Sequence, residues 1–257
     1  MASSLDLTGR VAVVIGGTSG LGRTIALGLA GAGADVVPTG RRATLAAEVC
    51  EEVEALGRRS LSTTVDVLER ESVDALRDRV LESFGHVDVL VYAAGTIVRR
   101  PTVQVPEDEW RSILDVNATG ALRACQSFYK ALSARRRGRV IHIASLNSFV
   151  SLKEVAAYAA AKSALLSLTR SLAVEWAAAG VNVNAIAPGV FRTELNRKLL
   201  DETDRGRELL MRTPIKRFGC PEELTGAAVL LASDAASFIT GQCLTIDGGF
   251  LASGVNS

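Results

Sequence analysis

Short apolar runs alternate with longer amphipathic stretches along most of the chain. The apolar runs predict strands at residues 10–15, 35–39, 60–65, 87–93, 139–144, 181–187 and 243–246. The stretches between them carry apolar residues three or four positions apart and predict helices at residues 21–32, 43–57, 69–84, 106–137, 155–179 and 221–233. Residues 192–213 are charged and show only weak helical periodicity.

This alternation predicts an α/β fold. Strands that alternate with helices from end to end form a parallel sheet with helices on both faces, here a doubly wound sheet of about seven strands. The first run, 10–15, is apolar after Arg10, which is typical of a strand buried on both faces. Pro38 has no amide hydrogen to donate, so we expect it at the end of its strand.

The composition is that of a single globular domain. The chain has 257 residues, of which 48% are hydrophobic and 22% charged, and this excludes a disordered protein. α/β folds often reach about 250 residues as one unit. Because no linker, low-complexity stretch or internal repeat interrupts the pattern, we expect one domain over residues 1–257.

Charge and apolar length argue against two classes of partner. The 29 Lys and Arg residues against 28 Asp and Glu residues give a net charge of +1, so there is no broad basic field for nucleic acid. No apolar run approaches the roughly 20 residues that span a bilayer, and the first residues lack the pattern of a signal peptide. We expect no nucleic-acid partner, no membrane partner and a cytoplasmic location.

The cysteines and histidines do not predict a metal site. The four cysteines lie far apart and form no Cys-x-x-Cys pair, so neither a zinc site nor a disulfide framework is indicated. His86 and His142 have no partners at the spacing of metal ligands. We therefore expect no bound metal.

A cluster of basic residues ends the predicted helix at 106–137. It consists of Arg135, Arg136, Arg137 and Arg139. A nucleic-acid patch is one interpretation of such a cluster. Cations also gather at the C-terminus of a helix, where they meet the negative end of the helix dipole, and this second interpretation is favoured.

A glycine-rich turn follows the first predicted strand. Its sequence, Gly-Gly-Thr-Ser-Gly-Leu-Gly, covers residues 16–22 and opens the helix at 21–32. Glycines let the backbone approach a pyrophosphate closely, and the helix N-terminus directs its amides and its positive dipole end at that anion. The spacing differs from the usual Gly-x-Gly-x-x-Gly, so it is the position between a buried strand and a helix that indicates dinucleotide binding.

The end of the second strand bears on which dinucleotide binds. NAD-preferring sites place an acid there for the ribose 2′-hydroxyl, but residues 37–42 are Val-Pro-Thr-Gly-Arg-Arg. Arg41 and Arg42 suit a 2′-phosphate because a guanidinium binds phosphate with paired hydrogen bonds. NADP(H) is favoured over NAD(H); the alternative is that these arginines stack on adenine or face solvent.

Three residues form a candidate proton-transfer set. Tyr158 and Lys162 are four residues apart in a predicted helix and therefore share one face. A phenol has a pKa of about 10, and a nearby ammonium lowers it. Such a tyrosine exchanges a proton with a carbonyl oxygen while a nicotinamide exchanges a hydride with the carbon. Ser145, just after a predicted strand, is expected to hydrogen-bond the same oxygen; chance gives this trio in about 0.005 of comparable chains.

Over nearly its whole length the sequence resembles the short-chain dehydrogenase/reductase family, whose fold is of the Rossmann type. The resemblance rests on the glycine turn and on Asn117, Ser145, Tyr158, Lys162, Asn-Val-Asn-Ala-Ile-Ala-Pro-Gly at 182–189 and Asp-Gly-Gly at 247–249. It implies that Asn117, Ser145, Tyr158 and Lys162 are the catalytic residues, with Asn117 supporting the lysine through a water molecule.

The resemblance also implies which residues contact the dinucleotide. Asp66 stands at the position that contacts adenine, and Val190 and Thr193 stand at positions that bind the nicotinamide carboxamide. The whole expected set is Gly16, Thr18, Ser19, Gly20, Leu21, Gly22, Arg41, Arg42, Asp66, Val67, Ala94, Gly95, Tyr158, Lys162, Pro188, Gly189, Val190 and Thr193. The family uses helices equivalent to 106–137 and 155–179 as subunit interfaces, which implies a homotetramer.

The sequence departs from the family pattern at three places. Ile15 stands where the family usually has Thr, and Tyr-Ala-Ala-Gly at 92–95 stands where it has Asn-Asn-Ala-Gly. The second change removes side chains that brace the central sheet and the cofactor ribose, but it leaves the proton-transfer residues intact. Ser19 stands where many NADP-using members have a basic residue, which argues against NADP.

The substrate pocket is expected between segments 95–101, 145–154 and 190–213. Its first candidate residues are Arg100, Asn147 and Arg192, with Arg99 beside them. These segments resemble most the gluconate 5-dehydrogenases and related sugar-acid dehydrogenases, and a guanidinium is well suited to the carboxylate of such a substrate. A solvated or structural role fits Arg99 and Arg100 equally well.

Three functions remain open at this point. The favoured one is an NAD(P)-dependent oxidoreductase that acts on a small carbonyl or secondary alcohol, a sugar acid such as gluconate or 5-ketogluconate. A 3-oxoacyl-thioester reductase shares all the motifs above. A non-catalytic NADP-binding sensor or scaffold is a different class, and the intact set of Asn117, Ser145, Tyr158 and Lys162 argues against it.

Overall fold

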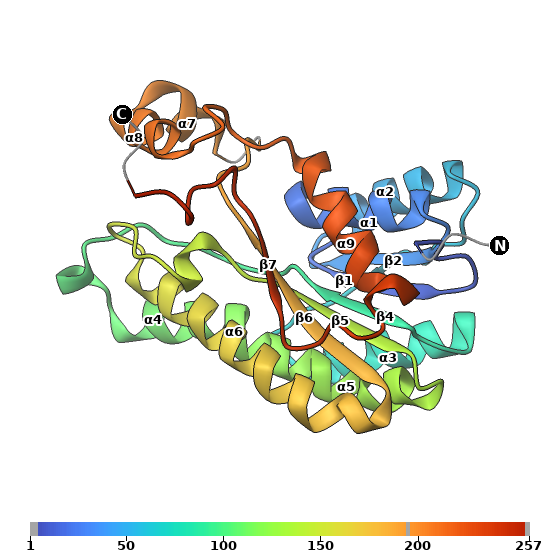
Figure 1. The fold of residues 1–257 in the computed structure, drawn as a ribbon. Helices are drawn as coiled ribbons and strands as arrows, with labels where there is room; N and C mark the ends of the chain where they lie inside the picture. Colours follow the sequence, from blue (N-terminus) through green and yellow to red (C-terminus); the bar gives the residue numbers. More distant parts are fainter. Residues whose placement is uncertain (1–4, 194–195, 255–257) are drawn as a thin grey trace.

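The computed structural model describes residues 5–193 and 196–254 and contains one parallel sheet (Figure 1). The sheet has seven strands in the order β3-β2-β1-β4-β5-β6-β7. The strands are β1 (Val11–Ile15), β2 (Asp35–Gly40), β3 (Thr63–Thr64), β4 (Val89–Tyr92), β5 (Gly138–Ile143), β6 (Val181–Pro188) and β7 (Cys243–Ile246). The predicted doubly wound α/β fold is confirmed.

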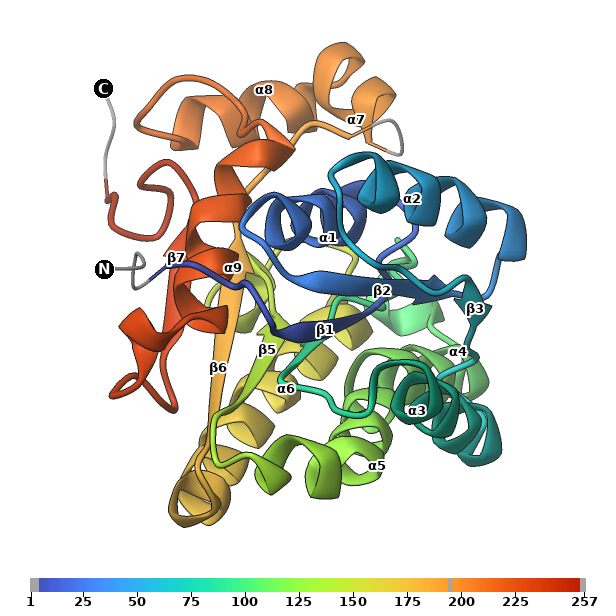
Figure 2. The same ribbon diagram turned by 90° about the vertical axis from the view of Figure 1, so that its right-hand side faces the viewer.

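Helices cover both faces of the sheet (Figures 1 and 2). One face carries α1 (Gly20–Gly31), α2 (Ala43–Ala55) and α9 (Thr225–Ala232). The other carries α3 (Arg70–Phe84), α5 (Gly120–Ala134) and α6 (Ala156–Trp176). Helix α4 (Glu107–Leu114) lies beside α6 on this second face. Two short helices, α7 (Arg197–Glu202) and α8 (Asp204–Arg212), stand apart from the sheet at the top of Figure 1.

Two apolar cores follow from this layering. Alternate residues of each strand point to opposite faces, so Val13 and Ile15 of β1 pack with α3, α5 and α6, whereas Ala12 and Val14 pack with α1 and α9. All five residues of β1 are buried. This explains why the sequence of the strand is apolar throughout instead of alternating.

Pro38 lies inside β2, not at the end of the strand as its chemistry predicted. On the β3 side of the strand, the Val36 amide donates to the Arg59 carbonyl, and strand geometry turns the nitrogen of Pro38 to that same side. Pairing there is interrupted between an isolated bridge at Ser60 and the two residues of β3, Thr63–Thr64. The amide hydrogen that Pro38 lacks would fall in this interruption, so no hydrogen bond of the sheet is lost. The strand predicted at residues 60–65 is longer than the two residues of β3.

The predicted helix at 106–137 is three segments. Helix α4 is followed by a π-helical turn, η2 (Asp115–Thr119), and then by α5. The Gly120 amide donates to the Asp115 carbonyl five residues back, which is the hydrogen bond that defines a π turn. Such turns often occur at functional sites, and this one carries Asn117.

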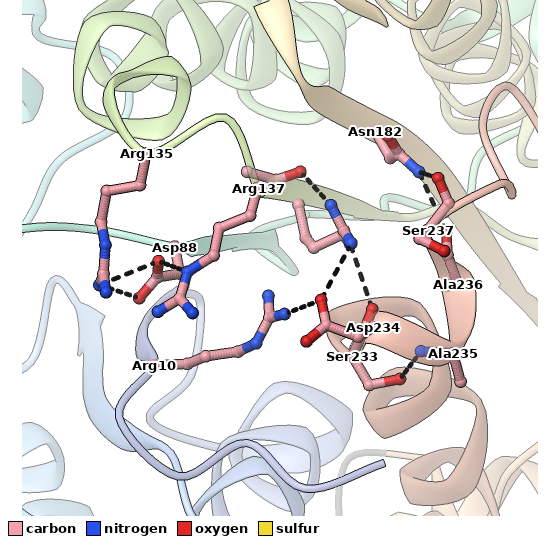
Figure 3. A network of polar contacts seen from close by, with 12 residues as sticks. Arg10, Asp88, Arg135, Arg137, Asn182, Ser233, Asp234, Ala235, Ala236 and Ser237 are labelled. Carbon is pink, nitrogen blue, oxygen red and sulfur yellow. Dashed lines mark hydrogen bonds and ion pairs between the residues drawn. The ribbon is translucent and has the colours of Figure 1, made fainter. Parts of the chain in front are cut away.

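The arginine cluster noted in the sequence lies at the amino edge of the sheet, where it pairs with buried Asp88 (Figure 3). Arg137 Nε donates to Asp88 Oδ1 at 2.9 Å, and Arg135 Nη1 lies 3.3 Å from both carboxylate oxygens. The Val11 amide donates to Oδ2 at 3.1 Å. Arg136 donates to the Ala178 carbonyl at 2.9 Å. These side chains are engaged by the protein itself, which supports the structural interpretation of the cluster.

Candidate active site

A large cleft lies at the carboxyl ends of β1, β4, β5 and β6. Its volume is about 1040 Å³, at the upper end of the range for small-molecule sites and large enough for a dinucleotide with a small substrate. The three segments expected to form the substrate pocket all contribute to its lining, together with the glycine turn. In open α/β sheets, ligands bind in this place because the strand order reverses there.

The glycine turn can receive a pyrophosphate. A Cβ at Gly16 would lie 2.5 Å from the Ala94 nitrogen, and one at Gly22 would lie 2.1 Å from the Gly16 carbonyl oxygen, so both positions need glycine. Helix α1 begins at Gly20 with no side-chain cap and no acidic residue in its first turn. Its first amides therefore remain available to an anion, and the residues present fit a dinucleotide.

The adenosine end of the cleft carries two cations. Arg41 and Arg42 are exposed and line the cleft. Arg42 Nη2 donates to Ser19 Oγ at 3.1 Å, so a guanidinium reaches the glycine turn at the position where the sequence has serine instead of a basic residue. Asp66 lines the cleft nearby, where its Oδ1 accepts the Leu68 amide at 3.0 Å. This arrangement suits a phosphate at the ribose.

Ser145 and Tyr158 both line the cleft, and their side chains are hydrogen-bonded to each other. Ser145 follows β5, and its Oγ accepts the Asn147 amide at 3.2 Å. Tyr158 stands in the first turn of α6. Burial raises the pKa of Tyr158, and the hydrogen bond with the Ser145 side chain lowers it. The two hydroxyls are therefore close enough to contact one substrate oxygen together.

Lys162 lies one turn further along α6, on the same face as Tyr158. It is buried, and its Nζ donates to the Ile143 carbonyl at 2.8 Å. Burial lowers the pKa of Lys162 to about 8. Nζ lies 5.6 Å from the centre of the Tyr158 ring. The ammonium is thus directed at a backbone carbonyl instead of the phenol, so burial dominates the Tyr158 pKa, contrary to the lowering that the spacing predicted.

Asn117 approaches the same place from the π turn. Its Nδ2 donates to the Thr96 carbonyl at 2.8 Å and to the Ile113 carbonyl at 2.9 Å. Its Oδ1 is buried and accepts no hydrogen bond from the described residues. A Cβ at Gly95 would lie 2.8 Å from that oxygen and 3.5 Å from Lys162 Nζ, so both atoms border Gly95.

The structure brings the expected site residues together, with two exceptions among the substrate candidates. All the residues expected to contact the dinucleotide line the cleft, as do Ser145 and Asn147, and Asn117 lies directly behind Gly95. Arg100 and Arg192 are absent from the described lining. Arg100 is paired with Glu109 at 3.1 Å, and Arg192 is paired with Asp201. Carboxylate partners on α4 and α7 thus hold both side chains.

Two other arginines line the cleft in their place. Arg99 Nη2 donates to Glu154 Oε2 at 2.9 Å, and Arg205 Nη1 lies 3.9 Å from the same oxygen. Arg205 of α8 was missed by the sequence analysis. The sequence signal that could have found it is helical spacing: Arg205 and Leu209 are four residues apart and therefore share one face of α8. In the structure both residues line the cleft. Burial and then the Arg99 charge lower the pKa of Arg205.

Residues 5–193 and 196–254 contain neither a candidate metal site nor a candidate membrane span. No group of three or more His, Cys, Asp or Glu side chains in this part of the chain is arranged to hold a metal ion. Within the same residues, no helix has the length and apolar content needed to cross a membrane.

Comparison with known proteins identifies the family. Residues 15–251 match a protein family described as enoyl-(acyl carrier protein) reductase. The chain is 41% identical to the 2-dehydro-3-deoxy-D-gluconate 5-dehydrogenase of Escherichia coli (strain K12), over 97% of this chain and 98% of the relative.

Two solved structures share the whole fold. One is a gluconate 5-dehydrogenase from Burkholderia cenocepacia J2315 in complex with NADP and tartrate, with a TM-score of 0.93, 37% identity and coverage of 98% of each chain. The other is a short-chain type dehydrogenase/reductase from Mycobacterium marinum, with a TM-score of 0.92 and 32% identity, covering 97% of this chain and 98% of that one. The chain therefore belongs to the short-chain dehydrogenase/reductase family and is an oxidoreductase of that family.

Proposed function

We propose that the protein is an NADP-dependent oxidoreductase that interconverts a secondary alcohol and a carbonyl on a sugar acid of the gluconate class. The observation that carries this proposal is the presence of two arginines, Arg99 and Arg205, in the same cleft as Ser145, Tyr158 and Lys162. The names of the relatives support it, since one acts on 2-dehydro-3-deoxy-D-gluconate and another was solved with NADP and tartrate.

In the oxidative direction, Tyr158 accepts the proton of the substrate alcohol. Ser145 holds the same oxygen by a hydrogen bond and so orients the reacting carbon. Bound NADP supplies the hydride acceptor for this carbon. In its charged form, Lys162 stabilises the phenolate of Tyr158. Asn117 presents a buried acceptor oxygen on the Lys162 side of Gly95, where it holds a water molecule that receives the proton from Lys162 and passes it on toward solvent.

The carboxylate of the substrate binds between Arg99 and Arg205. Both guanidiniums line the cleft and share one counterion, Glu154, which leaves one unit of positive charge for the substrate. Arg99 lies on the segment after β4 and Arg205 lies on α8, so a carboxylate between them is held from two sides. An arginine is suited to this role because its planar fork matches a carboxylate.

Arg99→Ala should raise KM for a sugar acid about tenfold while kcat changes little, because a charged hydrogen bond to the substrate is lost before the chemical step. Steady-state kinetics with gluconate and with a neutral ketone make the test. The ketone should be reduced at the wild-type rate.

Arg100→Ala is the matched control for this experiment. Its guanidinium is held by Glu109 outside the described lining of the cleft, so the KM for gluconate should stay near wild type. A larger effect from Arg100→Ala than from Arg99→Ala would contradict the proposed carboxylate site.

The cofactor proposal has its own prediction. Arg42→Ala should weaken NADPH binding about tenfold and leave NADH binding unchanged, because only NADPH carries the 2′-phosphate. Titration by the fluorescence of the reduced cofactors measures both affinities. Equal losses for the two cofactors would mean that Arg42 acts through the adenine or through the Ser19 contact.

The alternatives give different results in the same assays. A 3-oxoacyl-thioester reductase would reduce an acetoacetyl thioester with NADPH and ignore gluconate. A sensor or scaffold would bind NADPH and turn over neither the acetoacetyl thioester nor gluconate.

We also propose that the protein works as a single domain, as a homotetramer and in the cytoplasm, in line with the family resemblance. Sedimentation of the purified protein tests the oligomeric state.

A further inference from the structure

Tyr92 ends β4, at a position where the family pattern has asparagine. Its side chain is fully buried among apolar residues that include Ala121 and Phe128 of α5. Its hydroxyl donates to the Val116 carbonyl at 2.5 Å. Burial raises the pKa of Tyr92 far above its usual range, so the phenol stays neutral and remains a donor at every working pH.

The Val116 carbonyl accepts this bond because the helix is irregular there. In an α-helix the Gly120 amide would donate to Val116, four residues earlier. In η2 that amide donates to Asp115 instead. The Tyr92 hydroxyl reaches the Val116 oxygen from the neighbouring strand, so a side chain outside the helix supports the π turn at the point where its backbone pattern changes.

Gly120 makes room for this contact. A Cβ at Gly120 would lie 2.3 Å from the Tyr92 hydroxyl oxygen and 3.1 Å from the Val67 Cβ. Any other residue at this position would displace the phenol or the turn. The tyrosine and the glycine therefore form a matched pair in this chain.

The turn held in this way carries Asn117. Asn117 is adjacent to Val116 in sequence, and both hydrogen bonds of its Nδ2 go to backbone carbonyls, those of Thr96 and Ile113. Its Oδ1 is oriented only by this backbone, because it has no partner among the described residues. A shift of the Val116 peptide would therefore move Oδ1 away from Gly95 and Lys162.

We propose that Tyr92 is a positioning residue: through the Val116 carbonyl it holds the π turn that directs Asn117 Oδ1 toward Lys162. This inference rests on the proposed catalytic roles of Asn117 and Lys162.

Tyr92→Phe removes the hydroxyl and keeps the ring. We expect kcat to fall about tenfold while KM for substrate and for NADP stays within about twofold. We also expect the apparent pKa of kcat/KM for oxidation to rise by about half a unit, because a displaced Asn117 favours the Lys162 ammonium less and the Tyr158 phenolate is then less stable. Both are measured with gluconate and with a neutral alcohol.

Phe128→Leu is the matched control, because it disturbs the same core without touching the turn. It should lower the melting temperature at least as much as Tyr92→Phe and leave kcat and the pH profile at wild type. If Tyr92→Phe also changes only the melting temperature, Tyr92 is structural and the proposal fails.

A double-mutant cycle gives a second test. In an Asn117→Ala background, Tyr92→Phe should lower kcat by less than about twofold, since its effect runs through Asn117. A further tenfold loss there would overturn the proposal.

Gly120→Ala, which presses on the hydroxyl instead of deleting it, should reproduce the kinetic pattern of Tyr92→Phe. An active Tyr158→Phe enzyme would instead refute the catalytic assignment itself, so the two failures are distinguishable.

Discussion

Replacing Tyr158 by Phe should lower kcat about a thousandfold in both directions, which corresponds to about 4 kcal/mol of transition-state stabilisation. The change removes the hydroxyl that exchanges a proton with the substrate oxygen and keeps the ring in place. Ser145 remains, but its hydroxyl donates a hydrogen bond without being acidic or basic enough to replace the phenol. The protein should otherwise be intact, because only one oxygen atom is lost.

Two measurements separate this result from general damage. NADPH titration should give an affinity within about twofold of wild type, because the phenolic hydroxyl contributes little to cofactor affinity. Tyr129→Phe, on a ring that packs against Trp176 with centroids 4.7 Å apart, should leave kcat unchanged. A Tyr158→Phe enzyme within about tenfold of wild type would mean that another group transfers the proton.

The chemistry-bearing motifs were predictable because each is local in sequence. The glycine turn lies within residues 16–22, and its position between a buried strand and a helix defines what it can bind. Tyr158 and Lys162 are related by helix geometry, which the periodicity of the segment predicts without knowledge of the fold. Strand order then brings Ser145 to the same edge of the sheet.

The arginines of the substrate pocket were harder to predict from the sequence, because the direction of a side chain in a loop depends on partners that are distant in sequence. Arg99 and Arg100 are adjacent, and nothing local distinguishes them. In the structure Glu154 attracts the first and Glu109 the second, and these acids come from different segments. Arg205 was missed for a related reason: its role depends on where α8 packs, and nothing local in its segment specifies that position.

Backbone irregularities were the second kind of feature in which the structure differs from the sequence prediction. The sequence predicted one helix over residues 106–137, and it did not distinguish the π turn at Asp115–Thr119 because the segments on both sides of the turn are helical as well. Glu154, with φ of +71°, is a non-glycine residue in the left-handed region, and no propensity predicts it. It lies between the two arginines of the cleft, where strained residues often occur.

Asp88→Ala should destabilise the protein by about 3 kcal/mol, seen as a lower midpoint in urea. Asp88 is fully buried, immediately precedes β4, and accepts hydrogen bonds from Arg135, Arg137 and the Val11 amide (Figure 3). Its removal leaves that amide without an acceptor and two guanidiniums without a counterion. Because the arginines are partly exposed and regain water, the cost falls at the lower end of the range for a broken buried ion pair.

Asp78→Ala is the control, because it removes a carboxylate that is exposed instead of buried. Asp78 pairs with Arg77 on the surface of α3 and is 65% exposed, so water replaces the lost contact and the midpoint should barely move. The kcat of folded Asp88→Ala should stay within about twofold of wild type, because the amino edge of the sheet is remote from the cleft at its carboxyl edge. An equal, small change in both variants would mean that the arginines around Asp88 contribute as little as surface ion pairs do. A loss confined to Asp88→Ala would show that this cluster stabilises the sheet from the side opposite the proposed chemistry.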